Sequence, residues 1–147
     1  MSIENSMRLI KKVHPTSVIL VRIGNFYRVY GKDAYILSYF FDYKIEQKKD
    51  KTCGFPLSSL NKVIVELEIQ KIDYIIVDRK DNYEVIEKQE FKKENTYETV
   101  YSLAVLEINL RNRINNLNEY LINNIHNKEM IDKIKKLEEL VYEEWKV

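Results

Sequence analysis

Residues 18–30 have the sequence VILVRIGNFYRVY, and the prediction of the fold begins with them. The first half, 18–23, is an apolar run rich in β-branched residues, which is typical of a buried strand. Gly24 and Asn25 give a turn signal, and residues 26–30 then alternate between outward and inward positions as a second strand does. The segment therefore predicts a β-hairpin early in the chain.

Helical patterns lie on both sides of this hairpin. Before it, Ile3, Met7 and Ile10 recur at helical spacing within residues 2–13, and Pro15 ends the pattern. After it, residues 32–41 suit a second helix. Further along we expect a strand at 43–47, a loop at 48–51, a bend at 53–56, a helix at 60–71 capped by Ser58 or Ser59, and strands at 74–77 and 83–86. These elements predict an α+β or α/β domain over residues 1–94.

The pattern changes from residue 95, after which glycine and proline are absent. Apolar residues follow a three-four repeat, first at Val100, Leu103, Leu110, Ile114, Leu117 and Leu121 and then at Met130, Ile134, Leu137 and Val141. His126 and Asn127 indicate a break between the two runs. The pattern predicts an antiparallel, coiled-coil-like helical hairpin over residues 95–147. Such a hairpin must bury its seam on itself, on the first domain or on another copy, and we expect a homodimer or a partner protein to use it.

Charge and glycine content exclude two classes of nucleic-acid and nucleotide binding. The 147 residues carry 24 basic and 23 acidic side chains, a formal net charge of +1, which excludes an overall polybasic surface. The three glycines, Gly24, Gly31 and Gly54, lack the spacing of a phosphate-binding loop or a dinucleotide fingerprint. We therefore expect no nucleotide cofactor.

Cysteine use and hydropathy indicate the compartment. The single cysteine cannot form a disulfide within the chain, which favours a reducing environment. The longest early apolar run, 18–21, is interrupted by Arg22 and is too short for a signal peptide or a membrane span. We expect a cytoplasmic protein that does not bind a membrane.

Two blocks of sequence carry a resemblance to a known family. In the first, Arg22, Gly24, Phe26, Tyr27, Tyr30, Asp33 and Ala34 are in register with the pattern R-x-G-D-F-Y-E-x-[FY] followed by D-A. The second block is residues 53–56, CGFP, followed by a predicted helix and the strand at 74–77. In this order the blocks resemble the mismatch-recognition domain (domain I) of the MutS DNA mismatch-repair proteins, over roughly residues 7–80.

The resemblance implies a mixed sheet flanked by helices and a DNA-binding role. In the family, the phenylalanine that corresponds to Phe26 wedges into the duplex and stacks on the mispaired base, and a glutamate two residues later hydrogen-bonds that base. Here Arg28 stands at the glutamate position and Asn25 at the motif aspartate. A carboxylate accepts hydrogen bonds, whereas arginine only donates them. We place the candidate nucleic-acid interface at Phe26, Arg28, Arg22, Asn25 and Lys32.

Three functional hypotheses follow, and all lack an ATPase because its domains do not fit in this chain. The first is a nucleic-acid-binding module, with DNA expected and RNA left open. The second is a protein-interaction adaptor that keeps the fold without recognising nucleic acid, and the third is a mismatch sensor that recruits repair proteins. The adaptor predicts that Phe26 is buried or Arg28 is ion-paired, whereas binding predicts Phe26 exposed at a turn beside cations.

Catalysis and metal binding are not expected. A nucleophilic Cys53 would need a histidine partner, and neither His14 before a proline nor His126 at a helix break is placed to suggest one. These three residues also lack the spacing of metal ligands. The sequence thus predicts a binding protein with no metal or cofactor.

Overall fold

The computed structural model describes residues 1–143. Contacts divide the chain into two compact units, Met1–Ile108 (unit 1) and Asn109–Val147 (unit 2). Helix α4 (Tyr97–Asn123) contributes residues to both. The sequence predicts a domain boundary after residue 94, whereas unit 1 continues to Ile108. Its core includes Tyr97 and Val100 of α4, which are 0% and 7% exposed.

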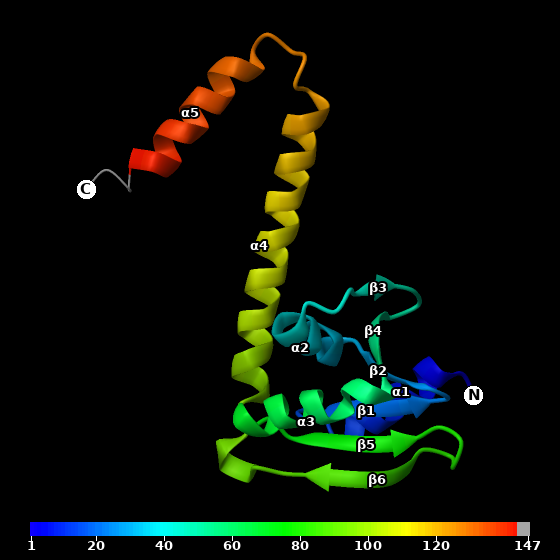
Figure 1. Cartoon of the computed structure of the whole chain (residues 1–147). Helices are drawn as coiled ribbons and strands as arrows, with labels where there is room; N and C mark the ends of the chain where they lie inside the picture. The colour runs from blue at the N-terminus through cyan, green and yellow to red at the C-terminus, as the bar shows by residue number, and fades with distance from the viewer. Residues whose placement is uncertain (144–147) are drawn as a thin grey trace. The chain divides into compact units, whose positions relative to one another are not determined.

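Unit 1 contains a six-stranded mixed sheet with helices on both faces (Figure 1). Its other elements are α1 (Ile3–Val13), β1 (Val18–Ile23), β2 (Phe26–Tyr30), α2 (Lys32–Phe41), β3 (Glu46–Gln47), β4 (Lys51–Pro56), η1 (Leu57–Ser59), α3 (Leu60–Ile69), β5 (Tyr74–Asp78), β6 (Glu84–Gln89) and η2 (Lys92–Glu94). The strand order is β3-β4-β2-β1-β5-β6, with β1 and β5 parallel and the other pairs antiparallel. The α+β class with a mixed sheet is confirmed.

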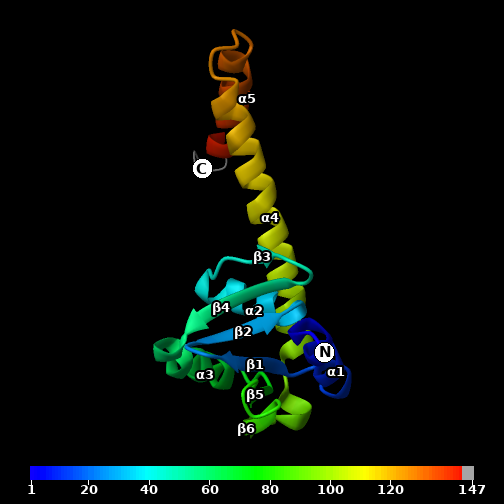
Figure 2. The same ribbon diagram turned by 90° about the vertical axis from the view of Figure 1, so that its right-hand side faces the viewer.

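The strands bury both faces of the sheet because successive side chains point to opposite sides. Val18 and Leu20 of β1 pack under α2, α3 and the start of α4, whereas Ile19 and Val21 pack under α1 together with Met7. Figure 2 shows α1 and α3 on opposite sides of the sheet. A strand buried on both faces has the continuous apolar sequence seen at 18–21.

The bend predicted at residues 53–56 is wrong, since these residues belong to β4. This strand pairs antiparallel with β2, in a register that places Gly54 opposite Arg28 and Pro56 opposite Phe26. Gly54 and Pro56 disfavour a strand locally, but Pro56 is its last residue and the ladder with β2 decides the conformation. Ser59 does occupy the N-cap position of α3, as predicted, but its side chain makes no capping hydrogen bond, and η1 leads into the helix.

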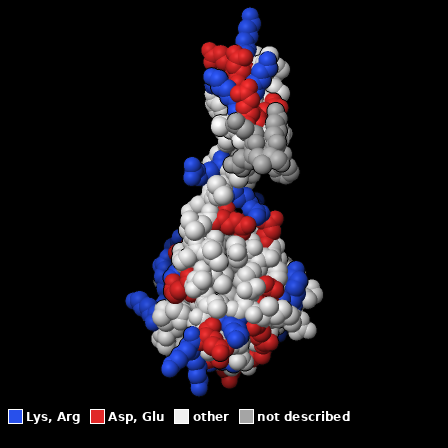
Figure 3. All heavy atoms as spheres, turned by 90° about the vertical axis from the view of Figure 1, so that its left-hand side faces the viewer, with Lys and Arg blue, Asp and Glu red and all other residues white. Residues whose placement is uncertain are grey.

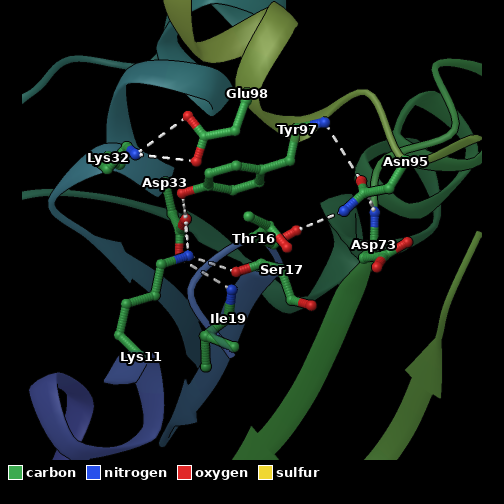
Figure 4. A network of polar contacts seen from close by, with 10 residues as sticks. All are labelled: Lys11, Thr16, Ser17, Ile19, Lys32, Asp33, Asp73, Asn95, Tyr97 and Glu98. Carbon is green, nitrogen blue, oxygen red and sulfur yellow. Dashed lines mark hydrogen bonds and ion pairs between the residues drawn. The ribbon is translucent and has the colours of Figure 1, made fainter. Parts of the chain in front are cut away.

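One buried carboxylate joins four elements at one end of the sheet (Figure 4). Asp33 is 2% exposed, and its Oδ1 accepts hydrogen bonds from Tyr97 Oη and Lys11 Nζ, both at 2.5 Å. Its Oδ2 accepts from the backbone N–H of Ile19 at 3.0 Å. Burial lowers the pKa of Lys11 although Asp33 opposes this, and burial, followed by Asp33, raises the pKa of Tyr97.

Unit 2 holds the second half of α4 and helix α5 (Met130–Glu143), which turns back after the break (Figure 1). The helical hairpin is confirmed, with helix interrupted between Asn123 and Met130 as the sequence predicts near His126. Met130 is 4% exposed and closes the end of the hairpin next to the break. Within residues 1–143, no helix combines the length and apolar character that crossing a membrane requires.

Candidate nucleic-acid interface

The candidate interface is built on the tight turn between β1 and β2. Gly24 has a φ of +61°, which glycine adopts without strain at the first position of a two-residue hairpin turn. The backbone N–H of Leu57 donates to Asn25 O at 3.3 Å and ties this turn to the end of β4. Phe26 is the first residue of β2 and is 54% exposed, so an aromatic ring stands at the tip of the hairpin.

Arg28 lies on the same face of the sheet as Phe26, because the two are separated by one residue of β2. Its neighbour across the strands is Gly54, where an added Cβ would lie 3.4 Å from Arg28 Cγ and 3.0 Å from Tyr27 O. Gly54 therefore gives the arginine side chain room to lie across β4. Among residues 1–143, no carboxylate pairs with the Arg28 guanidinium.

Arg22 flanks the tip from the opposite face. Arg22 lies directly opposite Tyr27 in the antiparallel β1–β2 ladder, so the two side chains are on the same face of the sheet. The side chain of Tyr27 belongs to the core under α2 and α3. Arg22 Nε donates to Gly24 O within the turn, at 3.4 Å. Arg22 and Arg28 thus approach the tip from two sides rather than forming one patch.

Two further cations reach this end of the sheet and were not predicted from the sequence. Since β5 runs parallel to β1, its end lies beside Arg22, and the backbone N–H of Arg79 donates to Arg22 O at 3.2 Å. Arg79 and Lys80 are exposed, and the described residues provide no carboxylate partner for either side chain. We call this end, where β1, β4 and β5 finish, the hairpin end of the sheet. The contribution of Arg79 and Lys80 to this end follows from the parallel pairing of β5 with β1, which is a contact between distant parts of the sequence.

Lys32 lies at the other end of β2. Strand β2 carries the chain about 13 Å from Phe26 to Tyr30 before Lys32 starts α2. There Lys32 Nζ pairs with the carboxylate of Glu98 at 3.2 Å (Figure 4). Lys32 Nζ also lies 4.5 Å from the centre of the Tyr101 ring. The structure therefore groups Asn25, Phe26, Arg22 and Arg28 but separates Lys32 from them.

The hairpin end combines an exposed ring with local positive charge. Beside it, Arg28 and Lys48 line a hollow of about 170 Å³ together with Glu4 and Asp50, so the charge there is mixed. Figure 3, which presents one face of the molecule, shows lysine, arginine, aspartate and glutamate interspersed around an uncharged area of unit 1. Charge of both signs is therefore mixed in this hollow and on this face.

Cys53 has the properties of a core residue. Its side chain is 1% exposed and Sγ contacts Ala34 O at 3.7 Å. Burial raises the pKa of the Cys53 thiol from 9.0 to about 12, which keeps it protonated at neutral pH. Residues 1–143 contain no cluster of histidine, cysteine and carboxylate side chains suited to a metal ion.

A model of a protein family, described as MutS domain I, matches residues 3–100, which is two thirds of the chain. The chain belongs to the MutS domain I family. This is a family of DNA-binding domains of the mismatch-recognition type. The match includes Tyr97 and Val100 at the start of α4, in agreement with their burial in unit 1. No curated protein matches the chain.

Several residues that carry the resemblance to MutS domain I have structural explanations here. Asp33 holds β1, α1 and α4 together, and Ala34 is fully buried beneath the sheet. Gly54 makes room for the side chain of residue 28. The turn glycine, Gly24, allows the aromatic ring of Phe26 to stand at the tip. Part of the family motif therefore builds the MutS domain I fold, and Phe26 is available for contact.

Proposed function

We propose that this chain is a DNA-binding module in which Phe26 acts as a wedge and the surrounding cations bind backbone phosphates. The supporting observation is the exposure of Phe26, at 54%, on a tight turn between two arginines that have no carboxylate partner within residues 1–143. An apolar ring placed in this way can insert into a base step, unstack it and kink the duplex. The exposure of Phe26 and the unpaired Arg28 favour binding over the adaptor hypothesis.

Arg28 favours recognition of deformable DNA over recognition of a particular mispair. The guanidinium carries only hydrogen-bond donors and keeps its charge, so it cannot accept a hydrogen bond from a base as a glutamate does. It suits a phosphate or a narrow minor groove. Unstacking costs about a few kcal/mol, and less where pairing is already defective. We therefore propose selection by ease of kinking, without an ATPase and without catalysis.

An electrophoretic shift assay tests the proposal. The DNA ligands are a matched duplex, a G·T duplex and a duplex with an unpaired loop, with single-stranded DNA and structured RNA for comparison, each at two salt concentrations. We expect the looped duplex to bind most tightly and the G·T and matched duplexes to differ little. Because four cations lie near the tip, log Kd should change with log salt with a slope of about 3 to 4. Absence of binding to every ligand would overturn the proposal, and tightest binding to RNA would replace DNA as the ligand.

Substituting the ring itself separates a wedge from general electrostatic attraction. Phe26→Ala should weaken DNA binding by about tenfold and reduce bending, because stacking of a base on an aromatic ring contributes about 1–3 kcal/mol. Val65→Ala is the matched control, since Val65 is 53% exposed on α3 and away from the turn. Equal affinity and bending in the two variants would show that Phe26 is not a wedge.

We further propose that the helices of unit 2 assemble the module, either with a second copy or with a partner protein, and that the protein acts in the cytoplasm. The exposed apolar side chains of α4 and α5 support assembly. The single buried thiol of Cys53 and the DNA-repair family support the location. Cell fractionation with an antibody to the chain tests the location, and recovery outside the cytoplasm would contradict it.

A further inference from the structure

Unit 2 leaves most of its apolar surface uncovered. On α4, Leu110, Ile114 and Leu117 are 54%, 57% and 51% exposed, and on α5, Leu140 and Val141 are 69% and 56% exposed. Single exposed apolar residues are common, but a stripe that continues over several helical turns marks an interaction surface. The stripe on α4 has the spacing of a helix-packing seam.

Helix α5 covers only the end of α4 that is next to the break. Met130 is 4% exposed, and Lys133 Nζ lies 5.7 Å from the centre of the Tyr120 ring. Beyond these first turns α5 diverges from α4 (Figure 1), and Leu110 and Ile114 remain exposed. The hairpin therefore does not bury its own seam.

The small size of unit 2 favours an external cover. It starts at Asn109 and so contains fewer than about 40 residues, the length below which isolated domains usually require disulfides, metals or oligomerisation. The chain has one cysteine, Cys53, and it is buried in unit 1. Among residues 1–143 no metal-binding cluster is present. Oligomerisation is a means that the exposed apolar stripe supports.

The charges of unit 2 are arranged so that its surface can complement the same surface on a second copy. Residues 109–143 carry six basic and six acidic side chains, so the net charge does not oppose self-association. In the unit 2 part of α4, Arg111 and Arg113 precede Glu119. Helix α5 opens with Asp132, after which Lys133, Lys135 and Lys136 precede Glu138 and Glu139. Antiparallel alignment of two copies places the basic half of each helix near the acidic half of its counterpart. Parallel alignment places like charges together.

We propose that unit 2 binds a second copy of this chain in antiparallel alignment, so that α4 and α5 of both copies enclose the exposed seam as a four-helix bundle. A two-fold interface requires a surface that complements itself, and the order of charges meets this requirement. The proposal deepens the assembly part of the proposed function and does not depend on DNA binding. Where DNA binding also holds, the dimer presents two Phe26 tips, and binding through both exceeds binding through one.

The mass of the full-length chain in solution provides the first test. Light scattering after gel filtration, over a range of concentrations, should give twice the chain mass of 17.7 kDa. The seam variant Ile114→Asp/Leu117→Asp should give the mass of one chain. The matched control Asn112→Asp/Asn115→Asp adds the same charge to exposed positions of α4 outside the seam and should remain dimeric. A wild-type mass of one chain at every concentration, or a seam variant that remains dimeric, would overturn the proposal.

Spin labels test the alignment. Cys53 is 1% exposed and escapes labelling in the folded chain, so an introduced cysteine carries the only label. In an antiparallel dimer, labels at Lys136→Cys, midway along α5, should be closer to each other than labels at Lys128→Cys, before α5. Equal distances at the two positions would contradict antiparallel alignment.

The same variants separate this proposal from DNA binding. If dimerisation fails but DNA binding holds, Phe26→Ala still weakens binding in a monomer and only the further proposal is overturned. If DNA binding fails but dimerisation holds, the mass remains twice that of one chain. When both proposals hold, the seam variant should bind a single DNA site as wild type does. It should lose the tight binding of wild type to DNA with two looped sites.

Discussion

The two ends of the β1–β2 hairpin use the same types of side chain in opposite ways. At one end Lys11 and Lys32 are paired with Asp33 and Glu98, and the contacts join helices to the sheet. At the hairpin end Arg28 has no carboxylate partner within the described part of the chain. The difference shows that a cation near a motif is informative about function only once its partners are known. Five substitutions test this contrast.

Asp33→Ala should have the largest effect, at the paired end. It leaves the Lys11 ammonium, the Tyr97 hydroxyl and the Ile19 N–H without their shared acceptor, so the free energy of unfolding should fall by about 3–5 kcal/mol. Urea unfolding followed by circular dichroism measures this. Asp50→Ala is the control, because Asp50 pairs with Arg8 at the surface and should cost less than about 1 kcal/mol. Equal losses in both variants would contradict the central role of Asp33.

Tyr97→Phe should change how stability depends on alkaline pH. Burial, followed by Asp33, raises the pKa of Tyr97 above its ordinary value of 10.0, so the folded chain keeps the phenol neutral while the unfolded chain ionises. The stabilisation is complete below pH 10 and is lost as the pH rises above it, by about 1.4 kcal/mol per pH unit. Urea unfolding between pH 9 and 11 should therefore show a shallower decline in Tyr97→Phe than in wild type. Parallel curves would mean that Tyr97 ionises normally in the fold.

Arg28→Gln and Lys32→Gln remove one positive charge from each end. The first should weaken DNA binding by about fivefold and lower the salt slope by about 1, because a phosphate contact is lost. The second should leave DNA binding unchanged, since Lys32 is paired with Glu98 at the other end of β2. Electrophoretic shifts at two salt concentrations measure both. Similar losses in the two variants would show that the contrast between the ends does not extend to binding.

Gly54→Ala should have the smallest effect. The new Cβ would lie 3.0 Å from Tyr27 O and 3.4 Å from Arg28 Cγ, so the strand and the arginine must both shift slightly. We expect a loss of stability of about 1 kcal/mol, typical of mild overpacking, and a decrease in DNA affinity smaller than that of Arg28→Gln. An affinity loss that exceeds the loss for Arg28→Gln would assign Gly54 a role of its own.

Local sequence was sufficient for most elements of the fold. The helical spacing of Ile3 and Met7, the β-branched run from Val18 and the turn at Gly24 act over a few residues, and the structure agrees with each. Strand β4 was missed because its conformation depends on pairing with β2, which outweighs the local preferences of Gly54 and Pro56. The order of the strands likewise depends on contacts between distant residues.

The candidate site was predicted only in part for the same reason. Phe26 and Arg28 come from one hairpin, so their proximity follows from the sequence alone. Arg79 joins them through the parallel pairing of β5 with β1, which a local pattern does not reveal. Lys32 was grouped with them because it is near in sequence, but a strand of five residues carries it to the other end.

Asn95 has a consequence for how the protein is made. Its side chain accepts from the backbone N–H groups of Asp73 and Tyr97, at 3.0 and 3.2 Å, and donates to Thr16 O at 2.9 Å, a contact that spans 79 residues of chain. During synthesis the β1–β2 hairpin leaves the ribosome early. The contacts of Thr16 and Asp33, at the end of the hairpin opposite the turn, form only after Asn95 and Tyr97 have also emerged. Native packing should therefore arise late, once the start of α4 has emerged, and nascent chains stalled earlier should stay sensitive to protease.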